Sequence, residues 1–216
     1  MDDVSPEPEG RPLGRRAFLA AMGVGASSLV WGDKALQLFQ SAVPVGNRWR
    51  IYAIDLPYPV YDPASWTLTV DGMVDRPQRF TMADLRALAP ARQTTDFHCV
   101  TGWSVPDVRW RGVRFATLLA RAGVKPGAKA LKFTSAEVPY VDTLTLEQLR
   151  APDAMVAFDM DDEPLTREHG APARVVMPRM YGYKGVKWLE RITVVDRIED
   201  GYWEQRGYSR DAYVES

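Results

Sequence analysis

The chain has 216 residues, of which 46% are hydrophobic and 25% are charged, a balance that is ordinary for a globular domain. Its net charge is −1, so no overall positive field exists to hold nucleic acid, and we expect no nucleic-acid partner. The length suffices for one hydrophobic core. We assign residues 1–43 to an N-terminal targeting segment and residues 44–216 to one folded domain.

The N-terminal segment carries the pattern of an export signal. Residues 14–19 read Gly-Arg-Arg-Ala-Phe-Leu, a twin-arginine pattern, and a mildly apolar run follows over residues 17–31. That run is shorter than the roughly 20 residues of a spanning helix and suits a signal peptide. We expect export by the twin-arginine machinery to the periplasm or another extracytoplasmic location, with residues 17–31 either cleaved off or kept as a membrane anchor. The alternative is an ordinary helix with a basic start.

Short strands and short helices follow one another in the folded domain. In chain order, the local patterns predict a strand at 65–70 with a turn at 71–72, a helix at 81–88, an extended segment at 92–100, a helix at 114–122, and strands at 130–134, 154–160, 174–177 and 191–195. The first helix begins like a capping box, a pattern that recurs at residues 145–148, and the second stops at Gly123. Without a regular strand–helix–strand rhythm, these elements predict an α+β fold with mixed sheets and short helices.

Cys99 is the only cysteine of the chain, so it has no internal disulfide partner. It follows His98, one of two histidines, and precedes a Gly-Trp-Ser turn. Three interpretations stay open from the residues alone: a buried small side chain, a metal ligand, or a nucleophile. Adjacent residues of a strand point to opposite faces, so His98 is badly placed to activate the thiol, and His169 would have to do so. In an oxidising compartment, a free thiol is a liability unless it is buried or metal-bound.

The ligand supply limits which metal site Cys99 can serve. Zinc and iron–sulfur sites usually take three or four Cys and His ligands, and this chain offers one cysteine and two distant histidines. A metal that arrives with most of its ligands on an organic cofactor needs only one protein thiolate. A lone cysteine with so few histidines therefore favours a molybdenum-type cofactor.

A basic segment supplies what such an anionic cofactor needs. Residues 174–191 contain five basic side chains and one acidic one, Glu190. Within it, residues 181–188 place glycines among basic and aromatic side chains, and glycine lets backbone N–H groups approach an anion closely. Arginine and lysine both suit phosphate. The alternative is a solvated face between two strands.

Five ordered segments together resemble the sulfite-oxidase-like molybdopterin oxidoreductases, most closely their bacterial single-domain branch, which includes the catalytic subunit of the periplasmic methionine-sulfoxide reductase. The resemblance covers residues 44–213. It rests on residues 66–72 (Trp-Thr-Leu-Thr-Val-Asp-Gly), 96–104 (Asp-Phe-His-Cys-Val-Thr-Gly-Trp-Ser), 169–174 (His-Gly-Ala-Pro-Ala-Arg), 181–188 (Tyr-Gly-Tyr-Lys-Gly-Val-Lys-Trp) and 201–208 (Gly-Tyr-Trp-Glu-Gln-Arg-Gly-Tyr).

The resemblance implies a set of site residues. Cys99 would be the catalytic thiolate ligand of molybdenum, which two dithiolene sulfurs and oxygen ligands complete. The other residues that it implies would bind the molybdopterin: Asn47, Thr134, His169, Arg174, Gly185, Val186 and Lys187. His169 stands where the sulfoxide-reductase branch has asparagine, and the residues around Asn47 depart from the family pattern. We further expect Arg179, Tyr181 and Lys184 to face the substrate at the mouth of the pocket.

The resemblance also implies the reaction, a two-electron transfer of an oxygen atom to or from a small oxo donor or acceptor such as sulfite or a sulfoxide. The chain has no room for the haem domain of the vertebrate enzymes, so we expect a separate electron-transfer partner, a cytochrome or a membrane haem protein. Two other functions are considered. A non-catalytic module would bind the pterin without redox activity, and a hydrolase would use Cys99 and His169 without metal.

Overall fold

The computed structural model of the chain describes residues 49–88 and 90–214, and it divides the chain into a unit of residues 1–56 and a unit of residues 57–216. All helices and strands named below belong to the second unit. The predicted twin-arginine segment and Asn47 lie outside the described residues. Within residues 49–214, no helix combines the length and the apolar character that crossing a membrane requires.

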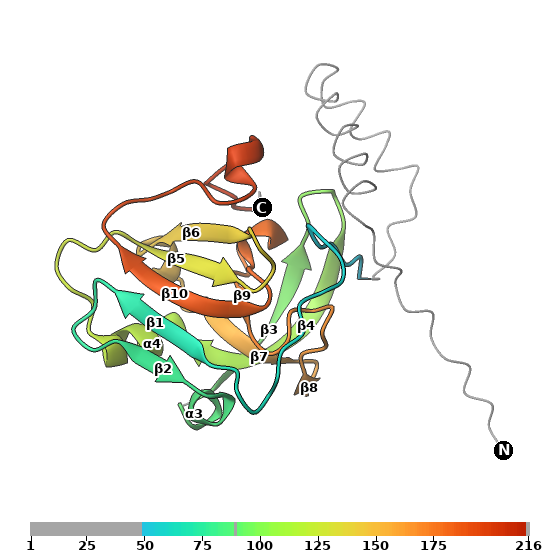
Figure 1. Cartoon of the computed structure of the whole chain (residues 1–216). Helices are drawn as coiled ribbons and strands as arrows, with labels where there is room; N and C mark the ends of the chain where they lie inside the picture. The colour runs from blue at the N-terminus through green and yellow to red at the C-terminus, as the bar shows by residue number, and fades with distance from the viewer. Residues whose placement is uncertain (1–48, 89, 215–216) are drawn as a thin grey trace. The chain divides into compact units, whose positions relative to one another are not determined.

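Two five-stranded sheets form the second unit (Figure 1). The first has the order β2 (Gln78–Phe80), β1 (Leu68–Gly72), β10 (Leu189–Val195), β5 (Ala130–Ser135) and β6 (Val141–Thr145). Strands β1 and β10 pair in parallel, and the other neighbours are antiparallel. This mixed sheet brings the C-terminal strand β10 to its centre.

The second sheet is antiparallel. Its order is β3 (Ala91–His98), β4 (Ser104–Arg114), β7 (Met155–Met160) and β8 (Glu163–Pro164), and β9 (Arg174–Val176) also pairs with β7. Strands β3 and β4 form a hairpin whose connection holds Cys99. Strand β9 begins with Arg174, so this sheet carries both the thiol and the first arginine of the basic segment.

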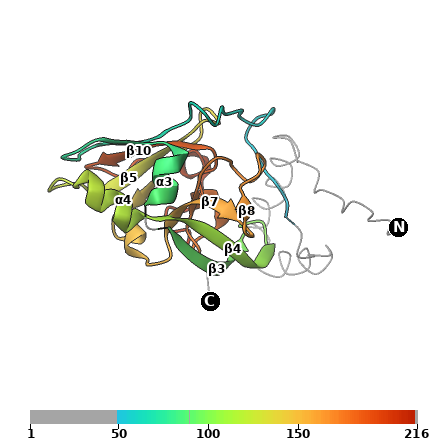
Figure 2. The same cartoon turned by 90° about the horizontal axis from the view of Figure 1, so that it is seen from below.

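Helical elements are short and begin or end at recognisable signals. They are α3 (Met82–Ala87), α4 (Phe115–Ala122), and three 3₁₀ turns, η1 (Gln148–Arg150), η2 (Gly182–Lys184) and η3 (Glu204–Arg206). Gly123 ends α4 in the left-handed region, with φ of 69°, where glycine carries no Cβ penalty. Helices α3 and α4 lie toward one end of the sheets and β8 toward the other (Figure 2).

One continuous core joins the two sheets. Leu68, Phe133 and Ile192 from the first sheet and Val113 and Val156 from the second are all buried in it. The inner face of α4 closes the core, because Phe115 and Leu118 are buried and Phe115 packs edge-on against Phe133. The core therefore fixes the two sheets against each other, which holds the loops that they carry.

The structure confirms the expected combination of mixed sheets and short helices, with strands predominating. All six predicted strands and both predicted helices are present, with ends shifted by a few residues. The predicted turn at residues 71–72 is wrong, since β1 continues to Gly72. Strands β2, β4, β6 and β8 were not predicted; β4 pairs with the neighbouring β3 and with the distant β7, whereas β6 pairs with the neighbouring β5.

The capping box of α3 provides a direct stability prediction. Thr81 Oγ1 accepts a hydrogen bond from Asp84 N at 3.2 Å, and Asp84 Oδ2 accepts one from Thr81 N at 2.9 Å. Thr81→Ala removes one of these, so we expect the free energy of unfolding to fall by about 1 kcal/mol. Denaturant unfolding measures this, and an unchanged midpoint would show that the cap contributes nothing.

Candidate functional site

Cys99 lies at the tip of the β3–β4 hairpin. Its backbone N–H donates to Trp103 O at 2.9 Å, and Gly102 N–H donates to Cys99 O at 3.0 Å. Gly102 completes this turn with φ of 87°, a conformation that disfavours other residues. The thiol is half-buried, and its Sγ lies 3.1 Å from Thr101 Oγ1. The turn thus holds Cys99 in a fixed place and leaves its sulfur partly accessible, which does not fit a buried small side chain.

His98 makes its contact within the hairpin. Its Nδ1 lies 2.8 Å from Ser104 Oγ, the residue paired with it across the two strands. The ring is therefore engaged by Ser104, in keeping with the expectation that His98 does not serve Cys99 as a base.

Tyr208 lies within electrostatic range of Cys99. The pKa of its phenol is raised to about 12, mainly by burial and further by the charge of the Cys99 thiolate. Its ring packs against those of Tyr183, at 5.0 Å between centroids, and Trp203, at 5.3 Å. At neutral pH Tyr208 is therefore a neutral hydroxyl near the thiol. Tyr208 belongs to the last of the five segments that carry the family resemblance, and no role was expected for it from the sequence.

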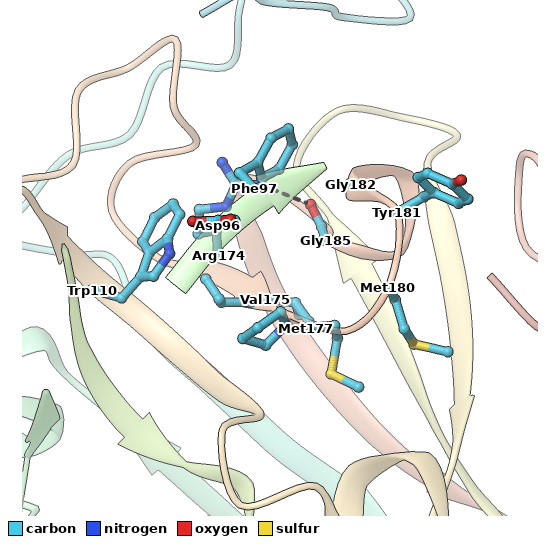
Figure 3. Close-up of a pocket in the computed structure, with 12 residues that line it drawn as sticks. Asp96, Phe97, Trp110, Arg174, Val175, Met177, Met180, Tyr181, Gly182 and Gly185 are labelled. Atoms are coloured by element: carbon cyan, nitrogen blue, oxygen red, sulfur yellow. Dashed lines mark hydrogen bonds between the residues drawn. The ribbon is translucent and has the colours of Figure 1, made fainter. Parts of the chain in front are cut away.

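Arg174 connects the two predicted anion-binding segments. Its Nη1 donates to His169 O at 3.1 Å and its Nη2 to Gly185 O at 3.4 Å. The guanidinium also faces the rings of Phe97, at 5.8 Å, and Trp110, at 5.4 Å (Figure 3). Because Phe97 stands two residues before Cys99 on β3, these contacts bring the basic segment to the strand that leads to the thiol.

The charge of Arg174 has no acidic counterpart in the described part of the chain. The residue is 4% exposed, its Nε is buried with no hydrogen-bond partner, and it forms no salt bridge with any described residue. Burial lowers its pKa to about 10. A buried cation without an acidic partner is costly, so this position favours an anion that the described residues do not themselves supply.

Lys187 and His169 add to the same positive region. Lys187 Nζ donates to Glu168 O at 3.1 Å and lies 4.1 Å from the centre of the Trp188 ring. Burial, and then the nearby charge of Arg174, lower the pKa of Lys187 to about 7. The same causes, with Lys187 added, lower the pKa of His169 to about 4. The three groups disfavour one another's protonation, and a bound anion would relieve this.

The backbone packs closely at two glycines of this region and leaves little room for a side chain. A Cβ on Gly185 would lie 3.0 Å from Val175 O and 3.2 Å from Arg174 Nη2. Gly170, with φ of 97°, packs directly on Lys187, where a Cβ would lie 2.9 Å from the Cα of that lysine. The glycines therefore bring the backbone of residues 169–170 and 185–187 together around Arg174.

Two further predicted residues occupy neighbouring positions. Val186 is fully buried, and its carbonyl accepts from Val175 N at 2.8 Å, so it anchors the loop in the core. Thr134 is half-buried on β5 opposite Arg191, and the hydroxyl of the next residue, Ser135, donates to Lys187 O at 2.7 Å. The structure thus gathers His169, Arg174 and the loop of residues 185–187, and it places the end of β5 against that loop.

The predicted substrate-facing role of Lys184 is wrong. Lys184 is 1% exposed, and its Nζ lies 2.6 Å from both Asp142 Oδ1 and Glu204 Oε1. Arg179 is exposed and pairs with Asp153 at 3.2 Å. Tyr181 is half-buried and lines a small cavity of about 20 Å³ together with Arg174 and Phe97. The local sequence gives the positions of the charged residues, but it does not show which of their side chains are buried.

A family model described as "Oxidoreductase molybdopterin binding domain" matches residues 55–203. The chain belongs to this family. The protein is therefore an oxidoreductase with a molybdopterin-binding domain of the sulfite-oxidase-like type. This membership accounts for the buried guanidinium of Arg174, because molybdopterin carries a phosphate.

Named relatives and a solved structure agree with the family. The chain is 38% identical over 154 residues to the uncharacterized oxidoreductase YuiH of Bacillus subtilis, covering 71% of this chain and 77% of that protein. It is 32% identical to the protein-methionine-sulfoxide reductase catalytic subunit MsrP of Gluconobacter oxydans, covering 67% of this chain and 52% of the relative. The crystal structure of the sulfane dehydrogenase SoxCD of Paracoccus pantotrophus matches with a TM-score of 0.60 and 28% identity, covering 65% of this chain and 41% of that chain. The chain thus spans about half of each of the latter two.

The residues present fit a phosphorylated pterin. Arg174 offers a buried Nε–H with no partner, and the phenol of Tyr58 is likewise buried with no hydrogen-bond partner beside the Lys187 ammonium. Three basic groups with lowered pKa values stand around glycines that admit a close backbone approach. These hydrogen-bond donors suit an anion that also carries other polar groups better than they suit a bare metal ion. The described residues hold no cluster of three or more Cys, His or carboxylate side chains that could bind a metal ion on its own.

Proposed function

We propose that the protein transfers an oxygen atom to or from a small sulfur compound at a molybdenum ion held by molybdopterin and by the Cys99 thiolate. One observation carries the proposal: a lone, half-accessible thiol lies at the end of the strand whose Phe97 packs on the buried Arg174 of the cofactor-binding region. The sulfur substrate is supported by the names of two relatives, a methionine-sulfoxide reductase and a sulfane dehydrogenase.

The cofactor, when bound, supplies the two-electron redox chemistry. Cys99 would supply the soft sulfur ligand that fixes the metal to the protein. Arg174 and Lys187 would hold the phosphate, with the backbone of Gly185 and Val186 alongside, while Thr134 and His169 would bind the pterin. Tyr208 remains protonated near Cys99, so its hydroxyl would donate a hydrogen bond to an oxygen of the bound substrate.

Electrons in this proposal come from or go to a separate protein. Oxidising sulfite with water yields sulfate, two protons and two electrons, whereas reducing a sulfoxide consumes two electrons and two protons and yields a sulfide and water. The described residues hold no second group of metal-ligating side chains that would store these electrons. The relative named as a catalytic subunit supports a partner subunit, and we propose a cytochrome or membrane haem protein for this role.

Extracytoplasmic location is part of the proposal. The twin-arginine pattern at residues 14–19 supports it, since that route exports proteins that have already folded around a cofactor. The periplasm would then be the site of the reaction, with residues 17–31 removed or kept as an anchor. Fractionating cells that express the full chain, and comparing them with an Arg15→Lys/Arg16→Lys variant, tests the location.

Two opposite assays test the reaction. Purified, cofactor-loaded protein is offered sulfite with ferricyanide as electron acceptor, and methionine sulfoxide with reduced viologen as donor. We expect turnover in at least one direction. Bound pterin with no turnover and no change in the molybdenum signal on reduction would instead favour the non-catalytic module. Hydrolase activity in metal-free protein would favour the Cys99–His169 alternative.

A further inference from the structure

A buried triad of charges joins three segments behind the cofactor-binding region. Lys184 of η2 places its Nζ 2.6 Å from Asp142 Oδ1 of β6 and 2.6 Å from Glu204 Oε1 of η3. The side chains are 1%, 3% and 3% exposed, respectively. A third bond runs from Lys184 Nζ to Thr143 O at 3.3 Å. The ammonium is thus fully engaged and shielded from water.

Two of the joined segments carry site residues. Lys184 immediately precedes the loop of residues 185–187, which the cofactor would contact, and Glu204 belongs to the turn that leads to Tyr208. A second contact holds the same two segments together, since Tyr183 Oη donates to Ser209 O at 2.7 Å and its ring packs on Tyr208. The triad therefore lies where the cofactor-binding loop meets the segment that brings a hydroxyl toward Cys99.

The charge balance of the triad depends on the protonation of its carboxylates. Two carboxylates share one ammonium, so a fully ionised triad leaves one negative charge in the interior. Burial, and also Glu204, raise the pKa of Asp142 to about 7 even though Lys184 opposes them. Asp142 also helps to raise the pKa values of the phenols of Tyr140 and Tyr183. The charges of Asp200 and Arg210 interact with Lys184 and Glu204, respectively. Near neutral pH, the Asp142 carboxyl therefore gains or loses a proton.

The space around the carboxylates is also closed. A Cβ on Gly201 would lie 2.6 Å from Glu204 Oε2 and 2.8 Å from Asp142 Oδ1, and Asp142 Oδ2 is buried with no hydrogen-bond partner. Water cannot enter this packed site to solvate an unbalanced charge. If one charge of the triad is lost, the segments that carry Lys184, Asp142 and Glu204 must shift, or the Asp142 carboxyl must change its protonation.

We propose that Lys184 is a positioning residue of the cofactor site: its ammonium, shared between Asp142 and Glu204, sets the position of the loop of residues 185–187 relative to Tyr208. This inference rests on the proposed function, because it presumes that the loop holds the molybdopterin. The triad would then have two roles: it supports folding, and it positions the cofactor-binding loop.

A neutral variant separates the two roles. Removing one partner of a buried pair destabilises strongly because it leaves an uncompensated charge, whereas replacing all charged members together by uncharged residues of similar size leaves no such charge. We expect Lys184→Met/Asp142→Asn/Glu204→Gln to fold with a Tm within a few degrees of the native protein. We also expect it to release pterin at least about fivefold faster and to lose at least about tenfold in kcat, because the loop is no longer fixed.

The control removes a more exposed charge pair outside the triad. Lys132 and Glu199 pair at 2.8 Å, and each side chain is about one third exposed. Lys132→Met/Glu199→Gln should leave both pterin release and kcat within about twofold of the native values. If the neutral triad variant keeps the native Tm, release rate and kcat, the triad only supports folding and the proposal is wrong.

Asp142→Asn gives a second test should the neutral variant fail to fold. It keeps the Lys184–Glu204 pair and removes the group that titrates near pH 7. We expect the native Mo(V) resonance to change between pH 6 and pH 8 and the variant's resonance to stay constant. The same pH dependence in both proteins would overturn the proposal. If the native protein binds no pterin, the proposed function itself fails; if it binds pterin and the variants match it, only the positioning role fails.

Discussion

Cys99→Ser is expected to lower turnover by more than about 100-fold while leaving the protein folded. The sulfur is half-buried and contacts Thr101 Oγ1, and the backbone bonds of its turn do not involve the side chain, so serine fits the same place. A serine hydroxyl is a harder and far less acidic ligand than a thiol. Loss of an outer partner of a metal site already costs about 10–100-fold, so loss of a ligand should cost more.

Three measurements on Cys99→Ser decide the outcome: kcat with the better substrate, Tm, and pterin content. We expect Tm within a few degrees of the native value, because a half-exposed conservative change has little effect on folding. Thr101→Val is the matched control, since it removes the contact of Sγ but keeps the thiolate, and it should retain kcat within about tenfold. Full activity of Cys99→Ser would remove Cys99 from the mechanism.

Cofactor retention is expected to weaken as the pH rises above 7. The pKa of Lys187 is about 7 without an anion, because burial and Arg174 disfavour its charge. A bound phosphate favours the charged form and raises that pKa, so binding takes up a proton when the pH lies between the two values. By linkage, the affinity should fall by up to about tenfold per pH unit across this interval. Pterin release should therefore be several-fold faster at pH 8.5 than at pH 7.

Lys187→Met tests the assignment of this proton. We expect the variant to release pterin about as fast at pH 7 as the native protein does at high pH, with little change between pH 7 and pH 8.5. Lys125→Met, a change at an exposed lysine, is the control and should behave like the native protein. Release from the native protein that is independent of pH, or slower at pH 8.5, would mean that Lys187 does not carry the proton.

Capping residues and glycine stops predicted several elements of the fold, because they act on residues within one turn of the chain. The reciprocal bonds of Thr81 and Asp84 join residues three apart, and Thr145 and Gln148 form the same pair ahead of η1. Gly123 ends α4 through its own backbone freedom. In each case, the residues that decide the structure lie within one turn of each other, so a single sequence contains the information.

Features that depend on distant partners could not be predicted in this way. Lys184 looks like one more cation of a basic segment, and only the arrival of Asp142, 42 residues earlier, and Glu204, 20 residues later, makes it a buried structural group. Tyr208 reaches the neighbourhood of Cys99 only because the C-terminal segment folds back.

The candidate site was predicted in part from the sequence, and its geometry came from contacts between distant segments. Ligand supply argued for a cofactor that brings its own donors, and the resemblance named the residues that would hold it. The structure adds that Arg174 organises the region, since it bonds to the backbone of both anion-binding segments and faces Phe97 on the Cys99 strand. It leaves the contacts of Thr134 and His169 with the cofactor as predictions.

X-ray absorption at the molybdenum edge tests most directly whether Cys99 binds the metal. The natively matured protein and Cys99→Ser are compared at equal molybdenum content. We predict that the native protein shows one more sulfur neighbour at molybdenum than the variant does. Identical sulfur coordination in the two proteins, or a native protein that contains no molybdenum, would contradict the account.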